Sequence, residues 1–204
     1  MASSASACAA INPATDALII VDMQNDFLVD GAPLHVPGGL ALVEAINAAS
    51  RQLTFRCQVA TQDWHTEDHC SFKEQGGLWP PHCVRGSPGA DLHADLRTDH
   101  LHWILRKGTR QAADSYSAFA DESKQPTGLA GLLHALGVTR VVVCGVAYDY
   151  CVFFTAMDAR RGGFDVVVVA DWCAAVDAAQ VPARTAALRE AGVRVVESSA
   201  LSAE

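Results

Sequence analysis

The length of 204 residues predicts a single domain. The chain has a formal net charge of −8, and 50% of its residues are hydrophobic and 19% are charged. This apolar content excludes an intrinsically disordered chain, because disordered segments lack the hydrophobic surface needed to build a core. The acidic balance argues against a nucleic-acid-binding protein, since binding to phosphates depends on clustered Lys and Arg.

The N-terminus shows no export signal. Residues 1–10 lack a basic stretch followed by a leucine-rich run, and no run in the chain approaches the ~18 apolar residues that cross a membrane. We therefore expect a cytoplasmic protein with neither membrane nor nucleic acid as a partner. We interpret residues 1–15 as a flexible tail on one domain spanning residues 1–204. The seven cysteines, an odd number scattered along the chain, are expected to stay free in a reducing compartment.

The first half of the chain combines short apolar runs with one amphipathic helix. We predict strands over residues 18–21, 58–61 and 103–105. A helix is predicted between the first two strands, where apolar residues recur at helical spacing: Leu42, Ile46, Ala49 and Leu53. Residues 63–99 form a Gly-, Pro- and His-rich segment without periodicity, and so long a loop in a compact domain usually carries function.

In the second half, a helix, a glycine and a β-branched run follow one another three times. The predicted pairs are a helix over 129–136 with a strand over 138–144, a helix over 152–159 with a strand over 164–170, and a helix opening at Pro182 with a strand over 193–196. This alternation is typical of an α/β fold with a mostly parallel sheet.

Polar and reactive side chains follow the predicted strands where they end. Asp22 follows the first strand, and Asp63 and His65 follow the second. Lys107 follows the third strand, and Cys151 lies shortly after the fourth. Because the carboxyl ends of parallel strands meet at one edge, where open α/β sheets bind ligands, we expect these residues to converge.

Cys151 is a candidate nucleophile, because the predicted strand-to-helix turn places it near a helix N-terminus. There, unpaired N–H groups and the helix dipole lower a thiol pKa and favour the thiolate. The N–H groups of Ala147 and Cys151 would also form an oxyanion pocket. A buried structural cysteine, which is our interpretation of Cys144, is equally consistent with the position taken alone.

Asp22 and Lys107 complete a set of base, cation and nucleophile with Cys151. A carboxylate beside a thiol can take its proton and later return it to a leaving amine. A lysine between that carboxylate and a reacting carbonyl would orient the acid and stabilise negative charge. Taken singly, Asp22 has the alternative of a strand-end carboxylate and Lys107 that of a solvated surface residue.

Asp63, His65 and His82 have the chemistry of a metal site. Two imidazoles and a carboxylate suit Zn²⁺ or Fe²⁺, and three protein ligands leave positions open for water and substrate. A set of loop histidines without a metal is the alternative, because the chain has eight histidines. Further candidates for the metal shell are His69, Cys70 and Cys83 as direct ligands and Ser71 through a water.

Several short motifs resemble, in order, those of the nicotinamidases, which are amidases of the isochorismatase-like hydrolase superfamily. They are Asp-Met-Gln-Asn-Asp-Phe at 22–27, Asp-Trp-His at 63–65, Trp-Pro-Pro-His-Cys at 79–83, Gly-Ser-Pro-Gly-Ala at 86–90, Lys-Gly at 107–108 and Gly-Val-Ala at 145–147. A single Asp-x-His motif is weakly specific, but the combination, over residues 16–170, is highly specific.

The resemblance implies a Rossmann-like three-layer α/β/α fold with a mostly parallel sheet. It also implies hydrolysis of nicotinamide to nicotinate and ammonia, within NAD salvage, through a thioester on a cysteine. The residues that match the family's catalytic triad are Asp22, Lys107 and Cys151.

The family's other site residues match as well. Asp63, His65 and His82 match the ligands of a divalent metal, for which we expect zinc, with iron or manganese as alternatives. The residues expected to line the ring pocket are Phe27, Trp79 and Tyr116, and the step between Val146 and Ala147 matches a cis peptide bond. Tyr148 departs from the family, in which threonine is frequent at this position.

Three other functions stay open at this point. A related amidase for carbamoyl substrates would keep the Asp, Lys and Cys residues without needing a metal. A vinyl-ether hydrolase of the isochorismatase type would not need Cys151. A non-enzymatic metal-binding or redox-sensing protein would release no ammonia from nicotinamide, the small molecule that we expect as substrate. An exposed apolar surface would in addition allow a homo-oligomer.

Overall fold

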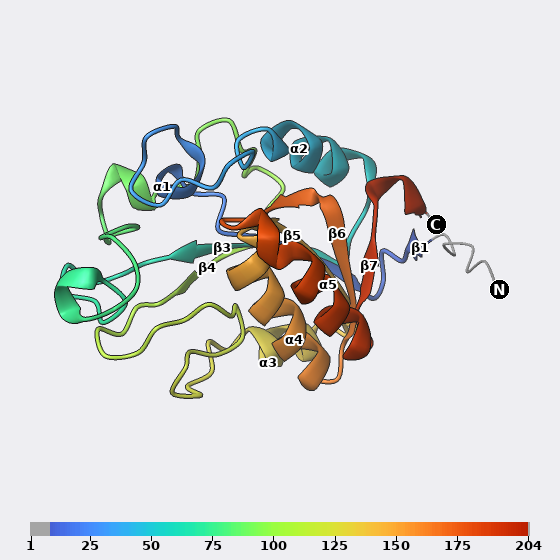
Figure 1. Ribbon diagram of the computed structural model, residues 1–204. Helices are drawn as coiled ribbons and strands as arrows, with labels where there is room; N and C mark the ends of the chain where they lie inside the picture. The colour runs from blue at the N-terminus through green and yellow to red at the C-terminus, as the bar shows by residue number, and fades with distance from the viewer. Residues whose placement is uncertain (1–8, 204) are drawn as a thin grey trace.

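The computed structural model describes residues 9–203, and its centre is a six-stranded parallel sheet with helices on both faces (Figure 1). The strand order is β4-β3-β2-β5-β6-β7, and every neighbouring pair is parallel. The strands are β2 (Asp16–Val21), β3 (Cys57–Asp63), β4 (Trp103–Lys107), β5 (Arg140–Val146), β6 (Asp165–Ala174) and β7 (Arg194–Val196). The predicted Rossmann-like α/β fold with a mostly parallel sheet is thus confirmed.

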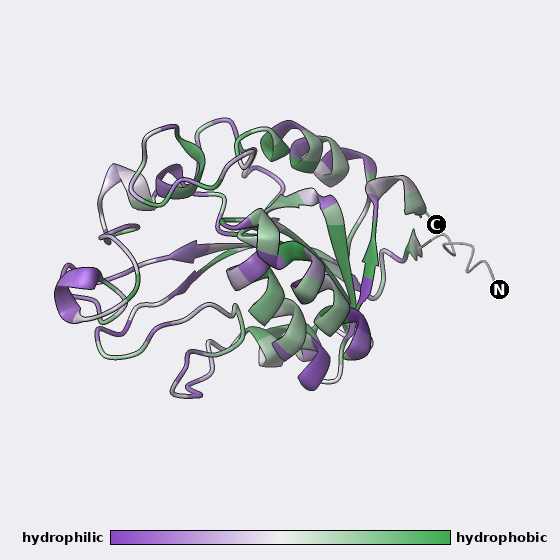
Figure 2. Ribbon diagram, viewed as in Figure 1, coloured by the Kyte–Doolittle hydropathy of each residue, from purple (hydrophilic) through white to green (hydrophobic). Residues whose placement is uncertain are grey.

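The central strands are apolar along their whole length because both of their faces are covered. In β2, Leu18 and Ile20 belong to one core cluster, whereas Ile19 and Val21 belong to the other. This alternation follows from the two-residue period of side chains in a strand. Hydrophobic colouring accordingly runs along β6 and β7, while the loop around η1 (Lys73–Gln75) is hydrophilic (Figure 2).

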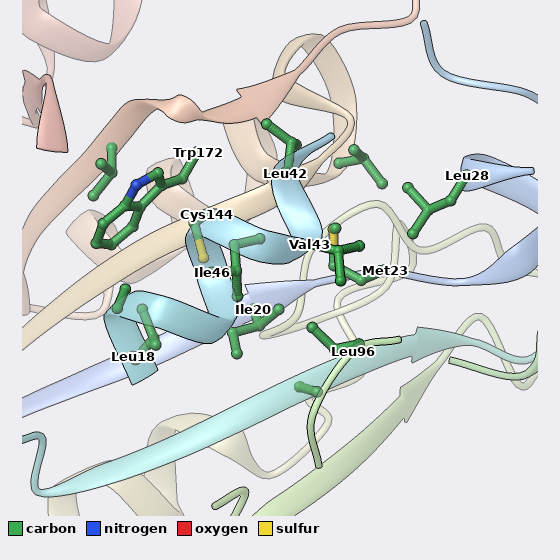
Figure 3. Packing of buried hydrophobic residues seen from close by; sticks show 14 of the residues in the cluster. Leu18, Ile20, Met23, Leu28, Leu42, Val43, Ile46, Leu96, Cys144 and Trp172 are labelled. Atoms are coloured by element: carbon green, nitrogen blue, oxygen red, sulfur yellow. The ribbon is translucent and has the colours of Figure 1, made fainter. Parts of the chain in front are cut away.

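A different set of helices covers each face of the sheet. The helix α2 (Leu42–Gln52) lies on one face, and its Leu42, Val43 and Ile46 side chains belong to the same core cluster as Leu18 and Ile20 of β2 (Figure 3). The helices that contribute to the cluster on the opposite face are α3 (Leu129–Ala135), α4 (Phe153–Arg161) and α5 (Val181–Glu190). The sheet is therefore the middle of three layers (Figure 1).

The remaining elements are short. They are the helix α1 (Asn25–Leu28), the strands β1 (Ala9–Ile11) and β8 (Leu201–Ala203), the 3₁₀ turns η2 (Pro88–Ala90), η4 (Ala178–Gln180) and η5 (Ser198–Ala200), and the π-helical turn η3 (Tyr148–Val152). Among residues 9–203, no helix is long and apolar enough to span a membrane.

The predicted flexible tail over residues 1–15 is wrong for residues 9–15. The strand β1 pairs in parallel with β8, and the Arg140 guanidinium binds both the Ala10 carbonyl oxygen and the Asp16 carboxylate. Pairing with the other end of the chain is a contact between segments far apart in sequence, which local patterns do not reveal. The rest of the predicted tail lies outside the described residues.

Most predicted elements differ from the observed ones only at their ends. The strand predicted over 58–61 extends over Cys57–Asp63, and the one predicted over 164–170 continues to Ala174. The strand predicted over 138–144 is shifted to Arg140–Val146, because Val138 already closes the turn after α3 through its N–H bond to Leu133. Strand ends depend on pairing with neighbours, so the apolar run alone locates them poorly.

Candidate active site

The carboxyl ends of four adjacent strands bring the predicted catalytic residues together. Lys107, the last residue of β4, is paired in register with Asp63, the last residue of β3. Asp22 follows β2 directly, and its φ of 50° turns the chain away from the sheet. Cys151 lies in the η3 turn after β5. The convergence expected from the topology is therefore observed.

Lys107 lies at the centre of this cluster and is 1% exposed. Its ammonium lies 2.8 Å from Asp22 Oδ2 and 2.6 Å from Asp63 Oδ1, and it donates to the Ser115 carbonyl oxygen at 3.0 Å. The Cys151 Sγ atom lies 3.5 Å from the same Nζ. Burial alone would favour the neutral amine, but the two carboxylates raise the pKa of Lys107 well above its usual value. The lysine is thus a fixed positive charge beside the thiol.

Hydrogen bonds from Thr61 and burial determine the setting of the Asp22 carboxyl group. The Thr61 hydroxyl donates to Asp22 Oδ1 at 2.6 Å and accepts the Asp22 backbone N–H at 3.1 Å. Burial raises the pKa of the Asp22 carboxyl, and the attraction of Lys107 only partly opposes this rise. A carboxylate with a raised pKa is a stronger base than an ordinary aspartate.

The expectation of a lowered Cys151 pKa is wrong. The thiol is buried, and this burial raises its pKa well above the usual value although Lys107 opposes the rise. The cysteine lies in a π-helical turn that continues into α4, and there the Asp22 and Asp63 charges add to the rise caused by burial. The cysteine is therefore a neutral thiol at rest, and a nearby base is needed to activate it.

Asp63, His65 and His82 form a three-residue cluster whose potential ligand atoms all lie within 4.8 Å of one another. The His65 Nδ1 atom hydrogen-bonds to the Gly108 carbonyl oxygen at 3.0 Å, and His82 Nδ1 to that of Pro80 at 2.8 Å. In each ring Nε2 is therefore the nitrogen left to bind a metal, in the arrangement usual for histidine ligands, although His65 Nε2 lies 3.6 Å from Asp63 Oδ2.

The protonation states of Asp63 and His82 fit a cation, whereas a metal would have to displace a proton from His65, because the attraction of Asp63 outweighs the burial of this ring and raises its pKa. Although burial opposes ionisation of Asp63, the Lys107 and His65 charges lower its pKa. Burial lowers the pKa of His82 to about 4, so this ring is neutral at pH 7. An ionised carboxylate and a neutral imidazole are the forms that coordinate metals. The three residues can thus hold a divalent metal.

A small cavity opens beside both clusters. The predicted residues that line it are Phe27, Asp63, His65, Trp79, His82, Tyr116, Ala147 and Cys151. Trp79 Nε1 donates to the Tyr116 hydroxyl at 3.0 Å, and the Trp79 ring meets Tyr150 edge to face at 4.9 Å. The cavity therefore has an aromatic wall next to the Cys151 thiol.

The match to a known family agrees with this geometry. Residues 16–200 match the model of the isochorismatase domain. The chain belongs to the isochorismatase family. The Val146–Ala147 peptide bond is cis, as the resemblance implied.

Relatives within this family support the same assignment. The nicotinamidase/pyrazinamidase of Mycobacterium tuberculosis is 41% identical over 187 residues, which cover 90% of this chain and 99% of the relative. The nicotinamidase of Escherichia coli is 38% identical over 183 residues, which cover 79% and 84%. The resemblance to nicotinamidases inferred from the motifs is confirmed.

Solved structures are similar over nearly the whole chain. PnC1 from L. infantum, in complex with nicotinate, is 61% identical with a TM-score of 0.95, and the match covers 97% of this chain and 100% of that chain. The pyrazinamidase of Pyrococcus horikoshii, in complex with zinc, is 38% identical with a TM-score of 0.78, covering 89% and 98%.

Several residues of this isochorismatase-family site were not singled out from the sequence. The unpredicted residues that line the cavity are Leu34, Asp114, Tyr150 and Val176. Gln24 holds the backbone of Asp63, since its side-chain amide accepts the Asp63 N–H at 2.7 Å and donates to the Asp63 carbonyl oxygen at 2.8 Å. Gln24 lies within the 22–27 motif, which is the one signal that could have indicated it.

The additional candidates for the metal shell lie at different places. His69 is buried, stacks on His65 with ring centroids 4.0 Å apart, and bonds to the Ser71 hydroxyl through Nδ1 at 2.7 Å. It belongs to a second cluster with His65 and Asp114. Cys83 is buried with a backbone N–H that Asp26 accepts at 2.7 Å. Among the described residues, Cys70 and Cys83 belong to no such cluster.

Proposed function

We propose that this chain is a nicotinamidase that hydrolyses nicotinamide to nicotinate and ammonia through a thioester on Cys151. The observation that carries the proposal is the buried set of Asp22, Lys107 and Cys151, which adjoins an aromatic cavity and a metal-type cluster. In support, relatives that are 38–41% identical are nicotinamidases, and a structure that is 61% identical binds nicotinate.

The aromatic side chains suit a flat pyridine ring. Phe27, Trp79 and Tyr116 offer faces and edges against which the ring of nicotinamide can pack. Holding the ring in one orientation brings the carboxamide carbon to Cys151, and such positioning makes the attack effectively unimolecular.

Asp63, His65 and His82 would hold the metal, which we expect to be zinc, with iron or manganese as alternatives. Their fit rests on the Nε2 atoms of both rings, whose Nδ1 atoms bind backbone carbonyl groups, and on Asp63 Oδ2, which lies 3.6 Å from His65 Nε2. A cation held there would offer a Lewis-acid site for the pyridine nitrogen, and the residues around it would then orient the carboxamide toward Cys151.

In the first half of the reaction, Asp22 accepts the proton of the Cys151 thiol while sulfur adds to the carboxamide carbon. Negative charge then develops on the carbonyl oxygen, and the backbone N–H groups of Ala147 and Cys151 stabilise it. Asp22 returns the proton to the amide nitrogen, the C–N bond breaks and ammonia leaves. Lys107 keeps the carboxylate oriented throughout.

In the second half, a water molecule attacks the thioester carbon and gives a proton to Asp22. The C–S bond breaks, the proton on Asp22 returns to the Cys151 sulfur, and the product leaves as nicotinate when its carboxyl group loses the second water proton to solvent. Asp22 thus acts as base and acid in each half, which its raised pKa favours.

The test is ammonia release from nicotinamide by the purified protein, with Cys151→Ala as the decisive variant. We expect the variant to release no ammonia but still to bind nicotinamide, because the ring pocket is unchanged. Cys57→Ala is the matched control, since Cys57 is a buried thiol at the opposite end of β3. Appreciable turnover by Cys151→Ala would contradict covalent catalysis.

Comparing the rates of hydrolysis of nicotinamide and of a carbamoyl substrate distinguishes a nicotinamidase from a related amidase. Maleamate, the substrate named for a 30% identical amidohydrolase from Pseudomonas putida, represents the carbamoyl class. We expect nicotinamide to be the better substrate, because the metal-type cluster lies in the cavity wall. The same proposal includes a place in NAD salvage and a cytoplasmic location. It also includes the absence of nucleic-acid and membrane partners, and the formation of a homo-oligomer.

A further inference from the structure

A buried carboxylate with no part in this chemistry lies beside the nucleophile. Asp149 belongs to the η3 turn that carries Cys151, and its side chain is 0% exposed. In the described part of the chain it forms no salt bridge. A buried charge is costly unless hydrogen bonds compensate for the lost water. This cost raises the question of what the Asp149 carboxylate holds in place.

Both carboxylate oxygens of Asp149 accept backbone N–H groups from one distant segment. Oδ1 accepts the N–H of Val176 at 3.0 Å, and Oδ2 accepts the N–H of Asp177 at 2.9 Å. Hydrogen bonds to an ionised carboxylate are roughly twice as strong as those between neutral groups. The turn of the nucleophile is thereby fastened to the loop between β6 and η4.

The fastened loop is part of the active-site wall. Val176 lines the same cavity as Cys151, so one carboxylate connects the nucleophile with an apolar residue of the pocket. Tyr148, the neighbouring residue, adds a second attachment through its hydroxyl, which lies 2.5 Å from Thr185 Oγ1 of α5. Two consecutive side chains thus hold η3 against the segment 176–185.

We propose that Asp149 is a positioning residue that fixes Cys151 and Val176 relative to each other, and so relative to a substrate bound between them. This inference rests on the proposed function, because the relative position of Cys151 and Val176 matters only for a substrate that binds between them. Two acceptor oxygens are required. An asparagine offers one acceptor, and its NH₂ group would face a backbone N–H, donor against donor.

The experiment compares Asp149→Asn with the unchanged protein and with Asp171→Asn. Asp171 is the matched control, because its exposed carboxylate also accepts a backbone N–H, that of Ser198 at 2.7 Å, away from the cavity. We expect Asp149→Asn to lower kcat about 10- to 100-fold per folded molecule, with KM changed about threefold at most, since small displacements of reacting groups cost this much. Asp171→Asn should keep the kcat of the unchanged protein.

A second readout needs no substrate turnover. Iodoacetamide should alkylate Cys151 about fivefold faster in Asp149→Asn than in the control, because a loosened turn exposes a buried thiol. Peptide mass spectrometry measures the alkylation of Cys151 over time. If the unchanged protein releases no ammonia from nicotinamide, the proposed function fails, and this alkylation ratio still tests the positioning of Cys151.

Two results would overturn the role of Asp149. One is an Asp149→Asn protein with the kcat and alkylation rate of the control. The other is a loss of activity that merely follows the loss of folded protein in circular dichroism. If the asparagine variant does not fold, Asp149→Glu keeps both oxygens but displaces them by one methylene, and a kcat equal to that of the unchanged protein would then refute the role.

Discussion

At the scale of single residues, the decisive feature is one lysine shared by two carboxylates. Lys107 contacts Asp22 and Asp63 at 2.8 and 2.6 Å, and all three are buried. Burying any of these charges alone would be costly, and only their mutual contact makes the arrangement tolerable. The same ammonium therefore holds both Asp22, our proposed base beside Cys151, and the carboxylate of the metal-type cluster.

The raised pKa of Asp22 predicts the acid limb of the pH profile. Burial raises this pKa above the ordinary aspartate value of about 3.9. A general base works only when ionised, so kcat/KM should fall as the pH drops through the raised pKa. Initial rates of ammonia release from pH 4 to 8, with circular dichroism at each pH, test this. A profile that is flat down to pH 4 in folded protein would rule out Asp22 as the base.

At the scale of elements, the loop that follows β4 depends on a glycine. Gly108 has a φ of +61°, and a Cβ atom there would lie 2.4 Å from His65 Cε1. Only glycine lets the backbone approach the ring so closely while its carbonyl accepts the His65 hydrogen bond.

Gly108→Ala should therefore displace His65 and reduce bound metal at least about tenfold, consistent with the loss caused when the support of a metal ligand is removed. Metal content per protein after dialysis is the measurement. Gly163→Ala is the control, because Gly163 has a similarly positive φ of +89° but no neighbour within 4 Å of a Cβ. Equal metal content in both variants would show that Gly108 has no such role.

The packing of α2 on the sheet is a second prediction at this scale. Ile46 is 0% exposed and packs over β2, whereas Glu44 on the same helix is exposed. Ile46→Ala should lower the free energy of unfolding by about 2–5 kcal/mol, through lost burial and the cavity left behind. Urea denaturation measures this, and Glu44→Ala should change the value by less than about 0.5 kcal/mol. A loss below about 1 kcal/mol would show that α2 is loosely packed.

At the scale of the whole molecule, a bound metal would stabilise the fold. Its three expected ligands come from β3 and from the loops after β3 and before η2, so binding connects separate segments. At a metal concentration 100 times its dissociation constant, the gain is about 2.7 kcal/mol. For a chain of this size, that gain raises Tm by roughly 5–10 °C.

We expect chelation to lower Tm and to abolish ammonia release, and Zn²⁺, Fe²⁺ or Mn²⁺ to restore both. His82→Ala should show no such rise in Tm, because one ligand is missing. Calorimetry with and without each metal is the measurement. A chelated protein of unchanged Tm and activity would exclude the metal.

Much of this molecule could be predicted from local patterns. The helix–glycine–strand units depend on periodicity within about 15 residues, and so the parallel sheet was recognisable. The site residues could be predicted because parallel strands bring their carboxyl ends to one edge, whatever separates them in the sequence. The motifs then indicated which of these residues carry the chemistry.

Other features were decided only by the tertiary structure. The high pKa of the Cys151 thiol results from burial among Lys107, Asp22 and the core, whereas its place near a helix start had predicted the opposite. The β1–β8 pair and the Asp149 bonds to Val176 and Asp177 join segments with no pattern in common. The sequence by itself determined which chemical groups reach the sheet edge. Desolvation and long-range contacts exist only in the folded chain, and they determined how those groups are charged and held.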